Sequence, residues 1–282
     1  MVRYYQIGGI DIAVQAEELS GEEGNLLPFR TDKPGNPHVF HYERKETLDP
    51  PDGRLLYSEP ALRVYGGGLQ EQRYAGLVKD SWEQAYLRGT HQGKSHSIQL
   101  KTSRRSEGIC AREILDALAL EHLVVQNHGF ILHASYILWE GKAILFTAPS
   151  GTGKSTQAGL WEQLRGAELI NGDRAIVRWT DGNAVACGLP FCGSSQTCKN
   201  VTAPLGGIVY LGQSGKTTIQ RLTGVQAFRR IWEGCSINTW NREDVVLAAD
   251  TVQKTAGSVP VFYLNCTPDE SAVIALEQML GE

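Results

Sequence analysis

The spacing of apolar positions changes near residue 106 and divides the chain into two regions. In the first region, short β-branched, aromatic or alternating segments predict strands. Between them lie polar, glycine-containing segments, and six of the eleven prolines fall within the first 60 residues, which is typical of loops between short strands. No segment of this region has helical periodicity. Strands are predicted at residues 4–14, 55–58, 62–65, 82–88 and 95–100.

After residue 106, helical and strand patterns alternate. Residues 112–128 place apolar side chains at helical intervals and are followed by Gly129, so they predict one helix. Other helices are predicted at 156–165, which Gly166 ends, and from Gly224 onward. Strands are predicted at 130–138, 143–147, 207–211 and 259–264, with a hairpin turn at 180–183. The pattern predicts an α/β domain at residues 108–282, preceded by a β-rich N-terminal region at residues 1–107.

The last predicted helix carries a clear start signal. Thr267 is predicted as its N-cap, with Pro268 in the first helical position and Glu270 in the third, which together form a capping box. Apolar residues then recur at helical intervals, at Ala272, Val273, Leu276 and Leu280.

Composition and charge exclude several functional classes. The 282 residues contain 27 Lys and Arg against 31 Asp and Glu, so the basic excess of a general nucleic-acid or anionic-membrane binder is absent. No apolar run reaches the roughly 18 to 20 residues that cross a membrane, and the first residues lack the layout of a signal peptide. We therefore expect a cytoplasmic protein with neither nucleic acid nor a membrane among its partners.

The six cysteines form no metal-binding pattern. No Cys-x-x-Cys pair occurs, and Cys187, Cys192 and Cys198 are spaced by five and six residues, unlike the ligands of a zinc site. A metal or disulfide role for these three is disfavoured, and buried or incidental thiols are expected.

One segment carries a specific chemical signal. Residues 148–156, Ala-Pro-Ser-Gly-Thr-Gly-Lys-Ser-Thr, match the P-loop (Walker A) pattern G-x-x-x-x-G-K-[S/T], except that alanine replaces the first glycine. Glycine lets successive N–H groups converge on phosphate oxygens, Lys154 supplies a charge for the β- and γ-phosphates, and the Ser155 hydroxyl suits Mg²⁺. A strand is predicted before the loop and a helix after it, which disfavours a chance match. The predicted nucleotide-binding residues are Ser150, Gly151, Thr152, Gly153, Lys154, Ser155 and Thr156.

Two titratable residues are candidates for the chemistry. Asp173 follows a short apolar pair after the P-loop helix, where a carboxylate would hold Mg²⁺ or accept a proton from an attacking hydroxyl. The alternative for Asp173 is an ordinary turn residue after Asn-Gly. His133 lies on the predicted strand before the P-loop strand, where a lone histidine is more often a hydrogen-bonded core residue than a catalyst.

These segments together resemble a known family. Leu132-His133-Ala134, the P-loop and Leu-Ile-Asn-Gly-Asp-Arg at 169–174 resemble the catalytic domain of HPr kinase/phosphorylase, which belongs with the phosphoenolpyruvate-carboxykinase-like P-loop folds. The resemblance covers residues 112–282 and extends to stand-alone relatives such as the kinases of lasso-peptide precursors. It implies a P-loop kinase domain with a mixed β-sheet, which transfers phosphate from ATP to a hydroxyl. It is also compatible with a homo-oligomer.

The resemblance also assigns roles to residues. The family's histidine before the P-loop falls on His133, and its Asp-Asp pair, which serves metal binding and proton removal, falls on Gly172 and Asp173. One carboxylate is therefore missing, so Asp173 has to combine both roles or another acid such as Glu168 has to assist. The resemblance implies Asp173, His133 and Lys154 as catalytic residues and Ser155 and Asp173 as ligands of Mg²⁺. The loop that receives the HPr protein has no clear counterpart.

Three hypotheses follow. The first is a Mg²⁺-dependent kinase that moves the terminal phosphate of ATP to a hydroxyl of a peptide, a protein or a small metabolite. The second is a nucleotide-binding regulatory module with little or no turnover, which the missing carboxylate motivates. The third is a hydrolase that couples ATP cleavage to a partner's movement, which is disfavoured because no second segment carrying an arginine or a glutamine is evident as a switch. GTP or pyrophosphate remains open as the donor.

Other segments give weaker signals. The polar loop at 190–200 is either an acceptor-binding loop or an ordinary connection, and its Lys199 could meet a phosphate or a carboxylate. Arg229 and Arg230 are expected on the solvated face of a helix, and Arg104 and Arg105 on the surface.

Overall fold

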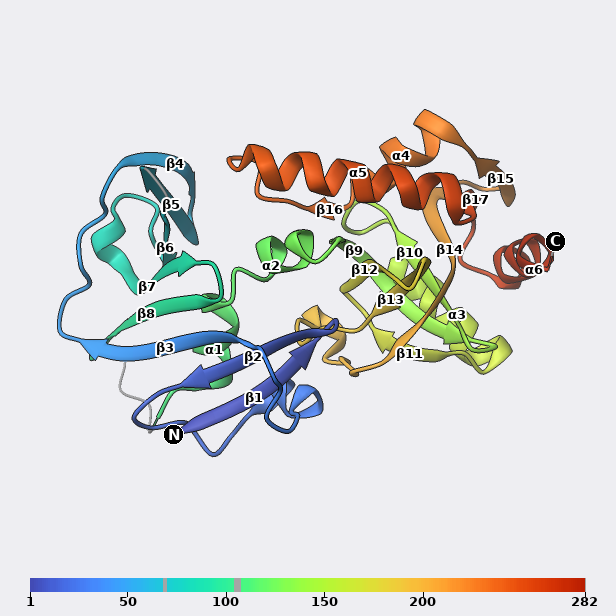
Figure 1. The fold of residues 1–282 in the computed structure, drawn as a ribbon. Coiled ribbons are helices and arrows are strands. Elements are labelled where there is room, and N and C mark those ends of the chain that lie inside the picture. Colours follow the sequence, from blue (N-terminus) through green and yellow to red (C-terminus); the bar gives the residue numbers. More distant parts are fainter. Residues whose placement is uncertain (68–69, 104–107, 282) are drawn as a thin grey trace. The chain divides into compact units, whose positions relative to one another are not determined.

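The computed structural model describes residues 1–67, 70–103 and 108–281 (Figure 1). The chain forms two compact units, Met1–Ala119 and Leu120–Glu282. This division lies later in the chain than the predicted boundary, because helix α1 (Ala111–Ala117) is bound to the first unit: the Tyr42 hydroxyl donates to the carbonyl oxygen of Ile114 at 3.4 Å. Residue 107, where the predicted boundary lies, and Arg104 and Arg105 are outside the described residues.

The first unit is built on an eight-stranded mixed sheet, in the order β1-β2-β3-β8-β7-β6-β5-β4. Its strands are β1 (Val2–Ile7), β2 (Ile10–Gln15), β3 (His38–Lys45), β4 (Arg54–Glu59), β5 (Leu62–Gly67), β6 (Gln70–Gly76), β7 (Ala85–Gln92) and β8 (Ser95–Lys101). β3 pairs in parallel with β2 and with β8, and the other pairs are antiparallel. Two short 3₁₀ helices, Gly24–Phe29 and Trp82–Gln84, complete its regular elements among the described residues.

The β-rich character predicted for this region is confirmed, but individual strands differ. The single strand expected at 4–14 is two strands, because Gly8 and Gly9 adopt positive φ angles of 57° and 79° and turn the chain back. β3 and β6 were not predicted. Both carry many polar and charged side chains, so their sequences lack the apolar alternation that marks a strand.

The second unit is built on a nine-stranded mixed sheet. Its strands are β9 (Gly129–Trp139), β10 (Lys142–Thr147), β11 (Glu168–Asn171), β12 (Arg174–Thr180), β13 (Asn183–Cys187), β14 (Thr202–Gln213), β15 (Thr218–Leu222), β16 (Cys235–Ser236) and β17 (Val261–Cys266). β10, β14 and β17 run parallel, and β9 pairs antiparallel with β10, β11, β12 and β16 at different points of its length.

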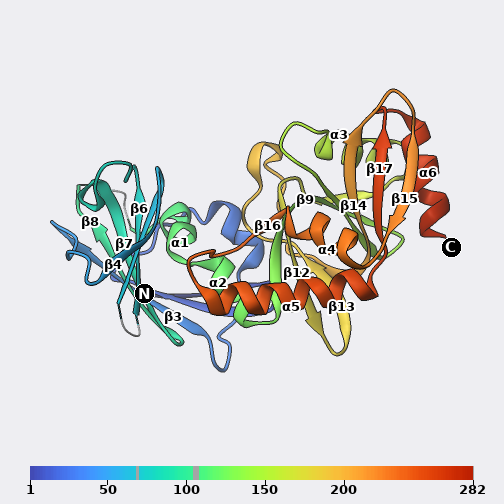
Figure 2. The same ribbon diagram turned by 90° about the horizontal axis from the view of Figure 1, so that it is seen from above.

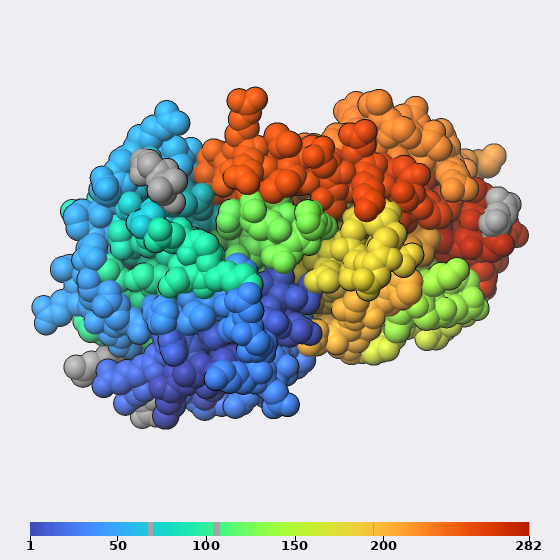
Figure 3. Space-filling model, in the orientation of Figure 1, coloured from blue at the N-terminus to red at the C-terminus, as the bar shows by residue number. Residues whose placement is uncertain are grey.

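Helices cover both faces of the second sheet (Figure 2). They are α2 (Leu120–Gln126), α3 (Lys154–Arg165), α4 (Gly224–Trp232), α5 (Arg242–Ser258) and α6 (Glu270–Leu280), and the short 3₁₀ helix Gly193–Ser195 lies between β13 and β14. Successive strand residues point to opposite faces, so two apolar clusters form. One cluster packs against α4 and α5 and the other against α3 and α6. α4 and α5 lie at the surface seen in Figure 3, where they appear as an orange band.

The predicted helices are corrected at two points. The helix expected at 112–128 is two short helices, α1 and α2, because Ala119 takes a left-handed φ of 47° and ends the first one. The N-cap of α6 is Asp269, not Thr267: the Asp269 carboxylate accepts the Ser271 N–H at 2.9 Å. Thr267 contributes instead by donating its hydroxyl hydrogen to Asp269.

Other predictions are confirmed. The strands at 130–138 and 143–147, the helix ended by Gly166 and the helix that begins at Gly224 are all present. β12 and β13 form the predicted hairpin, with Asp181 and Gly182 at positive φ. Helix α5 was not predicted, because its buried positions are mostly small or polar residues such as Ala248 and Thr255. No helix in the described part of the chain is long and apolar enough to cross a membrane.

Candidate functional site

The segment 148–156 has the strand, loop and helix that its sequence predicts. β10 runs directly into the loop and α3 begins at Lys154. Gly151 and Gly153 have φ angles of 78° and 114°, which favour glycine because a side chain is strained there. Gly153, the N-cap of α3, has no side chain that could cap the helix, so the first N–H groups of α3 are left to other acceptors. Gln213, at the end of β14, braces the loop by donating to the carbonyl oxygens of Gly151 and Thr152.

Lys154 is buried, with 8% of its surface exposed. Its ammonium group donates to the carbonyl oxygen of Ala148 at 3.0 Å and to that of Pro149 at 3.4 Å. Burial lowers the pKa of Lys154, and the carboxylate of Asp173 opposes this change. The charge is therefore held at the beginning of the loop, on the same side as Asp173.

Asp173 lies in the turn between β11 and β12, and Asn171 holds this turn. The Asn171 side-chain oxygen accepts the backbone N–H groups of Asp173 and Arg174 at 2.9 and 3.0 Å. Its amide donates to the carbonyl oxygens of Leu189 and Phe191, both at 2.9 Å. The carboxylate of Asp173 accepts from Nε of Arg174 at 3.1 Å, so it has a fixed cationic partner.

His133 lies on β9, the strand next to both β10 and β12. Its backbone N–H donates to Gly234, and its carbonyl oxygen accepts the Thr147 hydroxyl at 2.9 Å. Its ring Nε2 lies 3.6 Å from Oδ1 of Asp173. Burial lowers the pKa of His133, Lys154 lowers it further, and Asp173 works in the opposite direction. The neutral imidazole is therefore favoured.

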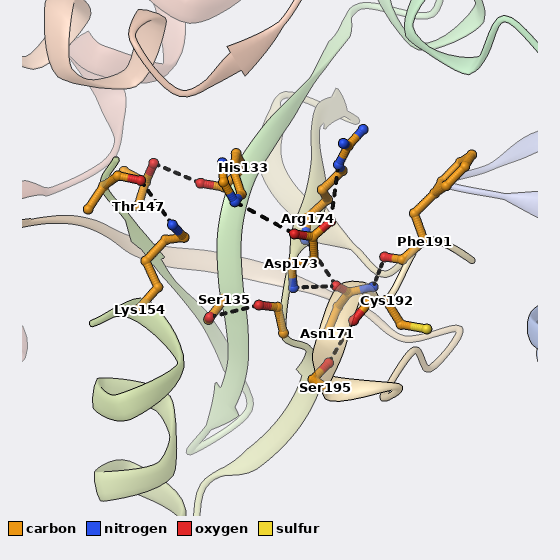
Figure 4. Close-up of polar contacts among 12 residues, drawn as sticks. His133, Ser135, Thr147, Lys154, Asn171, Asp173, Arg174, Phe191, Cys192 and Ser195 are labelled. Atoms are coloured by element: carbon orange, nitrogen blue, oxygen red, sulfur yellow. Dashed lines mark hydrogen bonds and ion pairs between the residues drawn. The ribbon is translucent and has the colours of Figure 1, made fainter. Parts of the chain in front are cut away.

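Three predicted residues thus come together from separate elements. Lys154 lies at the start of α3, His133 on β9 and Asp173 in the turn before β12 (Figure 4). Ser155 and Thr156 are exposed on the first turn of α3. The arrangement combines a glycine-containing loop at a helix N-terminus, a buried ammonium group and a carboxylate that faces an imidazole with a lowered pKa.

Ser195 leaves no room for a side chain at Gly172. A Cβ atom added at Gly172 would lie 2.4 Å from Oγ and 2.5 Å from Cβ of Ser195, so a side chain there requires Ser195 to move. Ser195 is held in turn by its hydroxyl, which donates to the carbonyl oxygen of Cys192 at 2.8 Å. Gly193, with a φ of 52°, also packs closely on Asp173, because a Cβ atom added at Gly193 would lie 2.9 Å from the Cβ of Asp173. The turn of Gly172 and Asp173 is therefore covered by the segment 192–195.

Two other candidates do not join the site. Glu168 begins β11 and Asp173 follows the end of that strand, and at about 3.3 Å per residue the two are well separated. The Glu168 carboxylate instead accepts from Lys199 at 2.8 Å, and both side chains are exposed. The sequence left open whether Lys199 meets a phosphate or a carboxylate. It binds the carboxylate of Glu168, a residue of the same chain.

The cysteines are all free. Cys187 and Cys192 are buried, as expected, and Cys198 is half-buried. Burial and a hydrogen bond with Cys192 raise the pKa of Cys198 to about 12. In the described residues, no group of three or more His, Cys, Asp or Glu side chains is arranged to hold a metal ion.

Two side chains of this region carry oxygen atoms of the kind that Mg²⁺ takes as ligands. This ion usually binds one or two carboxylates together with substrate phosphates and water, without an all-protein cage. Ser155 offers an exposed hydroxyl and the carboxylate of Asp173 is partly exposed, so both hard oxygen ligands are accessible. These two residues would hold the ion.

Sequence reasoning missed a cavity of about 540 Å³ beside the loop. Arg230 is one of its lining residues, and its side chain is 33% exposed against 74% for Arg229, so it is less solvated than expected. Its guanidinium lies over the ring of Tyr210, 4.4 Å from the ring centre, and 5.4 Å from that of Tyr263, and donates to Glu233 at 3.0 Å. Arg229 is exposed as predicted. Arg174 was also missed, although it directly follows Asp173.

Comparisons with known proteins give little further information. No protein-family model matches the chain, and no curated protein matches it. Among solved structures, the chain is similar to the Hpr(Ser) kinase/phosphatase from Coxiella burnetii, with 12% sequence identity and a TM-score of 0.34, over 54% of this chain and 88% of that chain. A similarity at this level carries no argument, so the function is inferred from the residues of the site.

Proposed function

We propose that this chain is a Mg²⁺-dependent phosphotransferase that moves the terminal phosphate of ATP to a hydroxyl acceptor. The observation that supports this most is the convergence of Lys154, His133 and Asp173 at a P-loop with the required backbone geometry. Phosphoryl transfer requires mainly correct positions and charge stabilisation from a protein, and these residues offer both.

The loop and Lys154 bind the phosphates of the donor. The N–H groups of the first turn of α3 and the positive end of its dipole attract the phosphate oxygens. Lys154 exchanges its bonds to the carbonyl oxygens of Ala148 and Pro149 for bonds to the β- and γ-phosphates. Mg²⁺, held by Ser155 and Asp173, would neutralise the charge that develops on the transferred group.

Asp173 accepts the proton of the attacking hydroxyl. Its Oδ1 faces His133, whose lowered pKa keeps the ring neutral and therefore able to share the proton. Arg174 fixes the other oxygen, Oδ2, and so sets the orientation of the carboxylate.

The test is transfer of labelled phosphate from ATP to candidate acceptors with Mg²⁺ present, together with calorimetric titration of ATP. We expect Lys154→Ala to abolish both the transfer of phosphate and the binding of ATP. Lys199→Ala is a matched control, since it removes an exposed lysine that is paired with Glu168. Transfer that is unaffected by Lys154→Ala would refute the proposal.

A second function, a nucleotide-binding module without turnover, is favoured by one observation. Gly172 stands where a second carboxylate would be needed, and Ser195 occupies the space that a side chain at position 172 would fill. Tight ATP binding with neither transfer nor hydrolysis over hours would support this second function.

A further inference from the structure

The 540 Å³ cavity lies next to the reacting groups of the proposed kinase. Thr147, Ala148 and Pro149, where β10 enters the P-loop, form one wall. Another wall is formed by α4 and the chain that follows it, and Tyr210 of β14 and His133 of β9 complete the lining. Its volume is within the range of about 300 to 1,000 Å³ that small-molecule sites occupy.

The terminal phosphate of the donor would arrive at the edge of this cavity. Lys154 contacts the carbonyl oxygens of Ala148 and Pro149, and both residues line the cavity. His133 lines it as well and faces Asp173. A molecule in the cavity would therefore have the donor phosphate on one side and the proton acceptor on another.

Arg230 gives the cavity a fixed positive group. Its guanidinium is stacked on Tyr210 and donates to Glu233, which limits its freedom. Glu233 also accepts from Arg229, so two cations surround one carboxylate and a net positive charge remains. A planar guanidinium held in this way suits the oxygen pairs of a carboxylate or a phosphate.

We infer that the acceptor is a small alcohol carrying an anionic group, a carboxylate or a phosphate, which binds Arg230 while its hydroxyl points toward Asp173 and His133. This inference rests on the proposed function. In the step, the acceptor oxygen forms a bond to the γ-phosphorus of ATP and the bond between that phosphorus and the β,γ-bridging oxygen breaks. The hydroxyl proton passes to Oδ1 of Asp173, and ADP leaves with the electron pair of the broken bond.

The test measures binding of three matched alcohols: glycerate, glycerol 3-phosphate and glycerol. The P-loop is first saturated with Mg²⁺ and a non-hydrolysable ATP analogue, so that a phosphate-bearing probe cannot occupy the loop itself. We expect one or both anionic probes to bind at least about tenfold tighter than glycerol, because a hydrogen bond to a charged group contributes about this difference in affinity. Glycerate and glycerol 3-phosphate then distinguish a carboxylate from a phosphate.

The variants assign this preference to one residue. Arg230→Gln removes it, Arg230→Lys retains part of it, and Arg221→Gln, which changes an exposed arginine of β15 that does not line the cavity, retains it in full. Equal binding of all three probes, or a preference that survives Arg230→Gln, overturns the inference. Weaker binding of the ATP analogue to Arg230→Gln, with the probe preference unchanged, also overturns it, since Arg230 would then serve the donor.

The two proposals fail separately. If the ATP analogue does not bind wild-type protein, the proposed function fails. The affinities for glycerate and for glycerol are then compared on the protein without nucleotide, which still tests the anion site. If phosphate is transferred to neutral alcohols or peptides as readily as to the anionic probes, the proposed function stands and the anion site is refuted. Thermal unfolding of each variant shows whether its fold is intact.

Discussion

Nε2 of His133 lies 3.6 Å from Oδ1 of Asp173, across two neighbouring strands. The register of β9 and β12 produces this approach, because His133 stands opposite Arg174, the residue after Asp173. The backbone N–H of Ala134 also donates to the carbonyl oxygen of Asp173 at 3.0 Å, which holds the two segments together at this point. The pair thus combines a neutral imidazole with a carboxylate oriented by Arg174.

Asp173→Asn should separate chemistry from binding. An amide cannot accept the hydroxyl proton, so we expect the transfer rate to fall by about 10²- to 10⁴-fold while the affinity for ATP changes little. Single-turnover transfer and calorimetry measure the two quantities. Asp181→Asn is the control, because Asp181 lies in an exposed turn at positive φ, where asparagine is tolerated. Equal losses in both variants would contradict the assigned role.

The rate of transfer should depend on pH through His133. Burial and the charge of Lys154 disfavour the imidazolium and lower the pKa from its ordinary value of 6.5. The neutral ring therefore predominates at pH 6.5. We expect activity to be lost as the pH falls below that value, because the ring is then protonated and can no longer share the proton of the acceptor. His133→Gln should remove this acid limb, and His41→Gln, an exposed substitution in the first unit, should leave it in place. An unchanged limb in His133→Gln would show that another group titrates.

Gly172→Ala should destabilise the second unit. The added methyl group would meet Ser195 at 2.4 to 2.5 Å, and overpacking of this kind costs about 1 to 3 kcal/mol. Ser195→Gly removes both contacting atoms, so the double variant should regain most of the lost stability. Urea unfolding followed by tryptophan fluorescence compares the four proteins. Additive losses in the double variant would show that the two residues do not compete for space.

The start of α6 offers a test of the corrected helix cap. Asp269→Ala should lower the free energy of unfolding by about 1 kcal/mol, because it removes the acceptor for the Ser271 N–H. Thr267→Ala should cost less, since Thr267 acts only through its contact with Asp269. If Thr267→Ala is the more damaging change, the capping box predicted from the sequence is the better description.

The local structure around the loop could be predicted because its signals are local. The left-handed turns of Gly151 and Gly153 and the strand and helix around them follow from residue type and periodicity within a short segment. By contrast, the one helix expected at 112–128 is two, because Ala119 ends α1 in a conformation that its side chain does not signal. Asp269 is the N-cap instead of Thr267 for a related reason: both residues, which lie on either side of Pro268, suit an N-cap, and only the path of the chain selects one.

The sequence alone determined the β-rich first region, the α/β second region and a strand-loop-helix segment suited to phosphate, since each depends on interactions between residues close in the chain. The tertiary structure decided which distant side chains reach that loop. Arg230 and Tyr210 line the adjacent cavity because the packing of α4 against the sheet brings them there, and Ser195 fills the space beside Gly172 because the segment 192–195 folds over that turn. Such approaches depend on the free energy of packing the whole unit, which no short segment encodes.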